Sequence, residues 1–264
     1  MTIRSVVLDV DGTLVRGDRP IPGAIEMVDE LRERGLDLLM LSNNPTRSSA
    51  DYADWLADLG FAVGPDEVVT SGSLTADYAA AEYPDAPTYL LGEEGLREML
   101  SARDIPLVSD PDRAAVVVAS IDREFTYDRL RDTLWALDGA TYLATDPDGT
   151  IPAADRPIPG SGAVVAAVSA AADRDPDAML GKPAATAAKA VESKVAGRGD
   201  EILVVGDRLD TDVLLGERAG MQTALVLSGV ATRTDAENST IVPDALLDSV
   251  AEVGDLLDST GGGE

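Results

Sequence analysis

The sequence predicts an α/β fold in which a parallel-sheet core is interrupted by a second α/β unit. Short apolar runs alternate with amphipathic stretches of helical length, which is the pattern of strand–helix–strand units with right-handed crossovers. Acidic and amide residues follow directly after several of the apolar runs. Because the carboxyl ends of parallel strands meet at one edge of a sheet, we expect these polar residues to converge on a ligand site.

The first sixty residues predict two strand–helix pairs. The first strand is the apolar run that starts at Val6, and it is followed by a helix that should end at Gly35. The second pair is a strand at residues 36–41, apolar on both faces, and a helix from about 46 to 59. The apolar stripe of the first helix consists of Ile25, Val28 and Leu31.

A second α/β unit is predicted inside the first, with residues 1–80 and 177–264 as the core and residues 81–176 as the insert. A boundary is expected at the turn Pro84–Pro87, because proline and aspartate interrupt regular structure there. The insert repeats the alternation of strands and helices. Its strands are expected near 89–91, 115–119 and 142–144, and its helices near 94–102, 127–137 and 161–172.

The last third of the chain should return to the core sheet. A helix is expected to start at the turn containing Lys182 and to run to about residue 196. Residues 202–205 are all apolar and lead into the acidic stretch Gly206–Asp212. The helix after that stretch should stop near Gly220, and a further strand is expected at 223–227.

Two missing residue types limit the chemistry. The 264 residues include no Cys and no His. Disulfides, thiol nucleophiles, Ser–His–Asp triads and the usual zinc sites are therefore excluded. Catalysis would have to use carboxylates, hydroxyls, Lys, Arg, backbone groups or a hard metal with oxygen ligands, which indicates Mg²⁺ or a similar ion.

The charge balance is strongly acidic. Asp and Glu number 48 against 21 Lys and Arg, for a net charge of −27. Such a surface repels nucleic acid and anionic membranes, so we expect neither as a partner. The acids are spread along the chain, which suits a halophilic protein. The sequence shows no basic leader and no apolar run of membrane-spanning length, so a cytoplasmic location is expected.

Asp9 and Asp11 end the first apolar run, and Gly12 turns the chain after them. Residues two apart on an extended strand point the same way, so both carboxylates can face one small volume. Their repulsion must be offset by a metal ion, a shared proton or both. The simpler alternative is that Asp11-Gly12-Thr13 is only a turn.

Three other segments carry groups that suit the same site. Asp207 could join Asp9 and Asp11 as an oxygen ligand of Mg²⁺. Ser42 and the backbone N–H groups at the start of the following helix could hold a phosphate oxygen, and Lys182 could supply a positive charge. Each also has a plain structural explanation: a turn and helix cap for Ser42-Asn43-Asn44, a surface lysine for Lys182, and a strand-end turn and cap for Gly206–Asp212.

Together these motifs resemble those of the haloacid dehalogenase-like phosphatases. They are Asp9-Val10-Asp11-Gly12-Thr13, Leu41-Ser42-Asn43-Asn44, Gly181-Lys182-Pro183 and Gly206-Asp207-Arg208-Leu209-Asp210-Thr211-Asp212. The insert between the second and third motifs is similar to the C2-type cap of subfamily IIA. The resemblance covers nearly the whole chain and implies a Rossmann-like core with an inserted α/β cap domain. It does not indicate which substrate is used.

The resemblance implies a Mg²⁺-dependent phosphomonoesterase that acts on a small phosphorylated metabolite. Asp9 is expected to be the nucleophile that forms an aspartyl-phosphate, and Asp11 the acid and then the base. Substrate-binding residues would be Ser42, Asn43, Asn44 and Lys182 on the core and Asp146 on the cap. The metal would be held by Asp9, the backbone carbonyl of Asp11 and Asp207, with support from Asp212.

One residue departs from the pattern of the family. Asp146, in Thr145-Asp146-Pro147-Asp148, stands where the family usually has Asn. The cap loop is expected to overhang the site, so Asp146 would add negative charge near the substrate. A compact leaving group that is cationic or a polyol would tolerate that charge.

Two other functions remain open at this point. A phosphotransferase or mutase could use the same core, and transfer of phosphate to an added alcohol would identify it. A non-catalytic Mg²⁺- and phosphate-binding module is the second, although such a module needs no acid/base at Asp11. The sequence leaves open whether the protein forms a homo-oligomer.

The net charge of −27 predicts that stability depends on salt. Screening of repulsion between surface acids should raise the unfolding temperature between low and molar salt, as measured by calorimetry. An unfolding temperature that stays constant or falls would contradict the interpretation as a halophilic protein.

Overall fold

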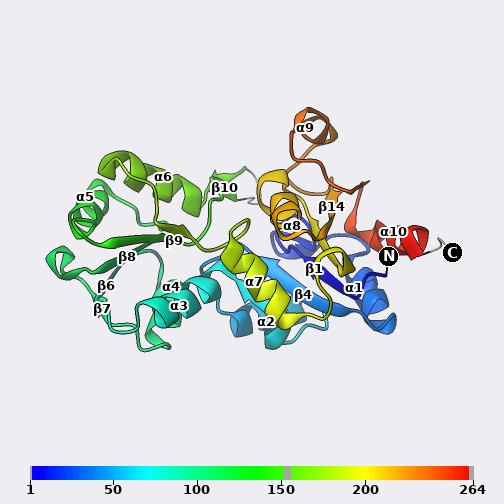
Figure 1. Cartoon of the computed structure of the whole chain (residues 1–264), viewed down its shortest axis with the longest axis horizontal. Coiled ribbons are helices and arrows are strands. Elements are labelled where there is room, and N and C mark those ends of the chain that lie inside the picture. Colours follow the sequence, from blue (N-terminus) through cyan, green and yellow to red (C-terminus); the bar gives the residue numbers. More distant parts are fainter. Residues whose placement is uncertain (1, 152–155, 262–264) are drawn as a thin grey trace.

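The computed structural model describes residues 2–151 and 156–261, and it contains two parallel sheets in two lobes that lie side by side (Figure 1). The first and last described residues, 2 and 261, both lie at the lobe that holds the larger sheet. The α/β class predicted from the alternating pattern is confirmed.

The larger sheet has six parallel strands in the order β15-β14-β13-β1-β4-β5. Its central strand, β1, is buried on both faces because Val6, Val7 and Leu8 are all apolar. It pairs with β13 on one side and with β4 on the other. The strands are β1 (Ser5–Leu8), β4 (Asp37–Ser42), β5 (Val68–Thr70), β13 (Ile202–Gly206), β14 (Gln222–Val226) and β15 (Ala245–Leu247).

Helices cover both faces of this sheet, because alternate residues of each strand point to opposite sides. Val6 and Leu8 pack with α1, α2 and the C-terminal helix, whereas Val7 packs with α7 and α8. The helices are α1 (Ala24–Glu33), α2 (Ser49–Asp58), α7 (Ala185–Lys194), α8 (Leu214–Ala219), α9 (Arg233–Asn238) and α10 (Val253–Gly261).

The second sheet is also parallel and has the order β12-β9-β8-β6-β7. Its two faces pack on α3 with α4, and on α5 with α6. The strands are β6 (Thr88–Leu91), β7 (Leu107–Val108), β8 (Val116–Ala119), β9 (Thr141–Ala144) and β12 (Ala178–Met179). The helices are α3 (Ser71–Glu82), α4 (Glu94–Ser101), α5 (Tyr127–Ala136) and α6 (Ser161–Ala172).

Several elements differ from the prediction or were not predicted. The helix expected from Thr46 begins only at Ser49, because Ser48 caps it. Residues Leu209–Val213 form one π-helical turn before α8. Two short hairpins were not predicted: β2 (Val15–Arg16) with β3 (Arg19–Pro20), and β10 (Thr150–Ile151) with β11 (Ile158–Pro159). The domain limits at 80/81 and 176/177 stay a prediction; β12 lies just beyond the second limit and still pairs with β9.

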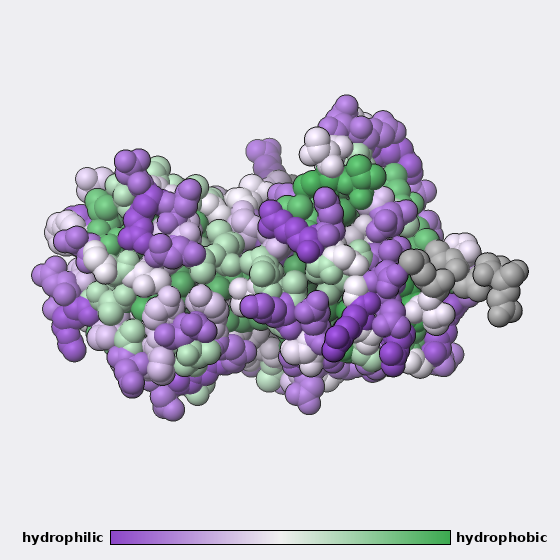
Figure 2. All heavy atoms as spheres, in the orientation of Figure 1, coloured by the Kyte–Doolittle hydropathy of each residue, from purple (hydrophilic) through white to green (hydrophobic). Residues whose placement is uncertain are grey.

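Hydrophilic residues are spread over the visible face of both lobes (Figure 2). This distribution agrees with the excess of acidic residues in the sequence. Within residues 2–151 and 156–261, no helix has the length and hydropathy needed to span a bilayer.

The two separate cores predict that damage to the second sheet stays local. Leu143 in β9 is fully buried in the core beneath α3 and α4. Leu143→Ala should cost about 2–5 kcal/mol of stability through lost contacts and a cavity. Hydrogen exchange should then speed up in β6, β8 and β9 before it does in β1 and β4. Equal acceleration in both sheets would contradict the division into two domains.

Candidate functional site

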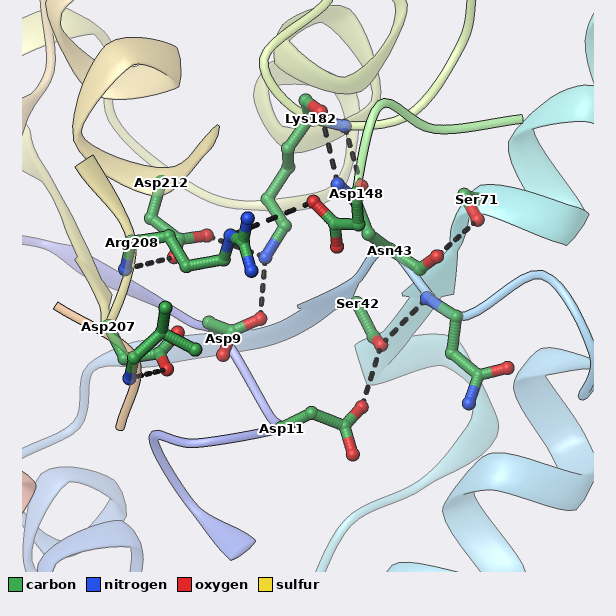
Figure 3. Close-up of polar contacts among 12 residues, drawn as sticks. Asp9, Asp11, Ser42, Asn43, Ser71, Asp148, Lys182, Asp207, Arg208 and Asp212 are labelled. Atoms are coloured by element: carbon green, nitrogen blue, oxygen red, sulfur yellow. Dashed lines mark hydrogen bonds and ion pairs between the residues drawn. The ribbon is translucent and has the colours of Figure 1, made fainter. Parts of the chain in front are cut away.

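The site lies at the carboxyl edge of the larger sheet, between the two lobes. Asp9 follows β1, Asp207 follows β13 and Ser42 ends β4, and these three strands are neighbours in the sheet. Lys182 comes from the connection between β12 and α7, where the chain returns from the second lobe. All four side chains line one cavity (Figure 3).

The ammonium group of Lys182 is held between two carboxylates. Its Nζ lies 2.6 Å from Asp9 Oδ1 and 2.7 Å from Asp212 Oδ1, and all three residues are buried. Burial alone would lower the pKa of Lys182, but the two carboxylates outweigh it and raise the pKa. Lys182 is therefore a permanent positive charge inside the site.

The carboxylates outnumber this single cation. Burial raises the pKa of Asp9 and of Asp207, and raises that of Asp212 to about 6 although Lys182 opposes the shift. Carboxylate oxygens of these three residues lie within 4.8 Å of one another. The site therefore has an excess of negative charge that further positive charge would relieve.

Two of these carboxylates keep an oxygen free. Asp9 Oδ2 and Asp207 Oδ1 are shielded from solvent and have no hydrogen-bond partner among the described residues. Both oxygens of Asp212 are engaged, one by Lys182 and the other by the backbone N–H of Arg208 at 3.1 Å. Free buried carboxylate oxygens are costly unless a cation or donor reaches them, so this pair suits a hard divalent ion.

Two glycines fix the position of the Asp207 carboxylate. A Cβ atom at Gly229 would lie 1.9 Å from Asp207 Oδ2, and one at Gly12 would lie 2.1 Å from it. Gly12 also has a φ of +103°, which glycine adopts without strain. The same oxygen accepts a hydrogen bond of 2.7 Å from the backbone N–H of Val230. Asp207 Oδ1 is left as the free oxygen.

Asp11 is partly buried and directs its side chain away from this cluster. Its Oδ2 accepts a hydrogen bond of 2.7 Å from the hydroxyl of Tyr52 on α2, and the hydroxyl of Ser42 lies 3.4 Å away. The carboxylate of Asp11 is not one of the clustered acids, and a metal role for its backbone carbonyl stays a prediction. Tyr52 was not predicted as a site residue. In the sequence, Tyr52 stands four residues before the inward-facing Leu56, which predicts only that both lie on the same face of the helix. That spacing does not distinguish a core residue from a site residue.

The side chains of Ser42, Asn43 and Asn44, which were predicted to bind substrate, form hydrogen bonds with the protein backbone. Ser42 Oγ accepts from the backbone N–H of Asn44 at 3.0 Å. The Asn44 side chain is used in its own turn, where Oδ1 accepts from the backbone N–H of Thr46. Asn43 holds the backbone of Lys182 through two hydrogen bonds of 2.8 and 3.1 Å. All three line the cavity, but Asn43 acts through Lys182.

Asp146 borders the cavity but is 1% exposed, and its carboxylate is engaged by neighbouring residues. It accepts from Thr145 Oγ1 at 3.0 Å and from the backbone N–H of Asp148 at 3.2 Å, and Ser71 Oγ on α3 lies 3.4 Å away. Burial, with the nearby charge of Asp148, raises the pKa of Asp146 to about 7. The structure thus places Asp146 in a network of hydrogen bonds within the second lobe, and its carboxylate is not an exposed charge above the substrate.

Asp148 and Arg208 were not predicted as site residues, and both line the cavity. Asp148 belongs to the loop after β9 in the second lobe, and Arg208 follows β13 in the first. The nearest approach of their charged groups is 3.8 Å. In the sequence, the one indication of a role for Asp148 and Arg208 is that they stand close to Asp146 and Asp207, which were predicted as site residues.

Comparisons with known proteins agree with this geometry. Two family models match the chain: haloacid dehalogenase-like hydrolase over residues 6–106, and HAD-hydrolase-like over residues 179–253. An acid sugar phosphatase of Staphylococcus aureus is 34% identical over 242 residues, which are 91% of this chain and 92% of that protein.

Solved structures give the same result. A p-nitrophenyl phosphatase from Archaeoglobus fulgidus superposes with a TM-score of 0.89 at 33% identity and covers 98% of this chain and 100% of its own. A glycerol phosphate phosphatase from Mycobacterium tuberculosis in complex with magnesium has a TM-score of 0.83 at 29% identity, over 94% of this chain and 75% of its own. With its motifs, fold and relatives in agreement, the chain belongs to the haloacid dehalogenase-like phosphatases of subfamily IIA.

Proposed function

We propose that this protein hydrolyses the phosphate monoester of a small metabolite, requires Mg²⁺, and works through an aspartyl-phosphate on Asp9. The observation that carries the proposal is the free oxygen Asp9 Oδ2. It is buried beside Lys182 and Asp207 and lines the cavity, while the other oxygen of the same carboxylate is fixed by Lys182. A carboxylate held in this way can act as a nucleophile.

The positive groups of the site suit a phosphoryl group. Lys182 can bind a phosphoryl oxygen without moving far from Asp9, since its Nζ already lies 2.6 Å from that carboxylate. The hydroxyl of Ser42 lines the same cavity to one side of Asp9 and can donate to a second phosphoryl oxygen (Figure 3). Fixed donors around the three equatorial oxygens are the main source of catalysis in phosphoryl transfer.

Asp9 and Asp11 divide the chemical work. A carboxylate oxygen of Asp9 forms a bond to phosphorus as the bond from phosphorus to the alcohol oxygen breaks, and Asp11 gives its proton to that alcohol. Asp11, now ionised, takes a proton from water, and the water oxygen bonds to phosphorus as the bond to Asp9 breaks. The hydroxyl of Tyr52, 2.7 Å from Asp11 Oδ2, holds the carboxyl group in place through both steps.

The residues present fit a magnesium ion. Asp207 Oδ1 is a free, hard oxygen donor in an acidic pocket, and the oxygen of Asp9 that does not attack phosphorus would be the second ligand. When bound, Mg²⁺ would supply positive charge that offsets the repulsion between the carboxylates and the phosphate. Asp212 is engaged by Lys182 and by a backbone N–H, so it supports the site from outside the ligand set.

Hydrolysis of 4-nitrophenyl phosphate tests the proposal. The rate should depend on added Mg²⁺, fall to background in EDTA, and be lost in Asp9→Asn, because the amide is not a nucleophile. Ser193→Ala on the exposed part of α7 is a control that should keep the rate. Activity that persists in EDTA or in Asp9→Asn would contradict the mechanism, and phosphate transfer to an added alcohol in preference to water would favour a phosphotransferase.

The packing around Asp207 predicts a specific metal defect. The side chain added in Gly229→Ala would collide with Asp207 Oδ2 and displace the carboxylate. The Mg²⁺ concentration for half-maximal activity should rise by about 10–100-fold, as for other changes that reorient a metal ligand. Gly64→Ala is the matched control, since its added Cβ would meet an ordinary contact of 3.7 Å. An unchanged Mg²⁺ requirement in a folded Gly229→Ala protein would argue against Asp207 as a ligand.

A further inference from the structure

The two lobes bring one charged pair together in the wall of the cavity that holds the reaction site. Asp148 comes from the second lobe and Arg208 from the first, and their side chains are 13% and 17% exposed. Arg208 Nη1 also lies 3.5 Å from the backbone carbonyl oxygen of Thr150 in the second lobe. Both residues line the cavity that also holds Asp9 and Lys182, so the part of a substrate beyond its phosphate can reach them.

Asp148 has an oxygen available for a ligand. Its Oδ1 is shielded from solvent and accepts no hydrogen bond within residues 2–151 and 156–261. Its ion pair with Arg208, at 3.8 Å, is too long for a hydrogen bond. Buried polar atoms without a partner are rare in folded proteins and are satisfied by water, ions or ligands.

The guanidinium group of Arg208 also lacks short hydrogen bonds to the described residues. Its three side-chain contacts are long, at 3.4 Å to Asp210 Oδ1, 3.5 Å to the Thr150 carbonyl and 3.8 Å to Asp148 Oδ1. A guanidinium group offers five N–H donors. Its hydrogen bonds to charged oxygens are typically about 2.7–2.9 Å long. Arg208 therefore keeps donor capacity beside an oxygen that lacks a donor.

We propose that Asp148 and Arg208 form a subsite that selects a leaving group bearing a hydroxyl. This inference rests on the proposed phosphatase function and adds the residues that choose the alcohol. A hydroxyl can donate to Asp148 Oδ1 and accept from Arg208 at the same time, which satisfies both residues.

The charges of the pair disfavour other leaving groups. An anionic group would gain from Arg208 but meet the carboxylate of Asp148, and an ammonium group would meet the reverse situation. The apolar side chains of Ile121, Ile151 and Val230 also line the cavity, so they can cover the carbon atoms of a short chain. The subsite suits the phosphate ester of a short polyol.

The test compares esters of equal carbon number. We expect kcat/KM for glycerol 3-phosphate to exceed that for propyl phosphate by about 10-fold or more, the range for a buried hydrogen-bonding site that loses its partner. In Asp148→Ala the ratio should fall to about 1–3, since the acceptor is gone. Asp148→Asn should keep an intermediate ratio because its amide oxygen still accepts, which a purely structural role would not predict.

Controls separate this inference from the function beneath it. Asp210→Asn removes a carboxylate that also faces Arg208 but is exposed, and it should keep the ratio of the unaltered protein. Equal kcat/KM for the two esters, or a ratio unaffected by Asp148→Ala, would overturn the subsite. A preference for 2-aminoethyl over 2-hydroxyethyl phosphate that is lost in Asp148→Ala would assign the site to cations and would also overturn it. Failure to hydrolyse any of these esters or 4-nitrophenyl phosphate would overturn the phosphatase function itself.

Discussion

The contact of one ammonium group with two carboxylates organises this molecule. Lys182 lies between Asp9 and Asp212, at 2.6 and 2.7 Å, and all three residues are buried. Each buried charge would be costly alone, and their mutual attraction offsets that cost only while the geometry is kept. The acids outnumber the lysine, and Asp9 and Asp207 each retain a free oxygen. The same arrangement thus leaves in the site an excess of negative charge and two oxygens without a partner among the described residues.

The position of Lys182 in the chain couples this site to the second lobe. Lys182 follows β12, the edge strand of the smaller sheet, and its backbone is held by Asn43 of the larger sheet. Asn43 is held in turn by Ser71 of α3, whose hydroxyl donates to its carbonyl oxygen at 2.8 Å. Asp146 lies against the same serine. A movement of one lobe over the other would therefore act directly on the residues that surround Asp9.

Much of this could be predicted from the sequence, for a physical reason. Short apolar runs rich in Val and Ile, such as Val6–Leu8 and Ile202–Val205, favour buried strands, and polar residues at the carboxyl ends of parallel strands lie at one edge of the sheet. That logic brought Asp9, Asp207 and Ser42 together. The absence of His and Cys narrowed the chemistry to carboxylates and a hard metal. The family resemblance then supplied the roles of individual residues.

What could not be predicted depends on contacts between distant segments. Tyr52 looks like a core residue of α2, and only the folded chain shows its hydroxyl on Asp11. Asp146 was expected to add charge above the substrate, but the packing of Ser71 and Thr145 around it engages its carboxylate. Asp148 and Arg208 are 60 positions apart in the sequence and lie in different lobes. The sequence around each of them contains no motif that predicts its contact with the other.

The central claim is that Asp9 attacks phosphorus. The most direct test is to quench the enzyme during turnover of 4-nitrophenyl phosphate, reduce it with borohydride, and map the peptides by mass spectrometry. An acyl phosphate on Asp9 is reduced to homoserine, so the account predicts homoserine at position 9 and unmodified Asp11, Asp207 and Asp212. Homoserine at another aspartate, or at none while turnover proceeds, would contradict it.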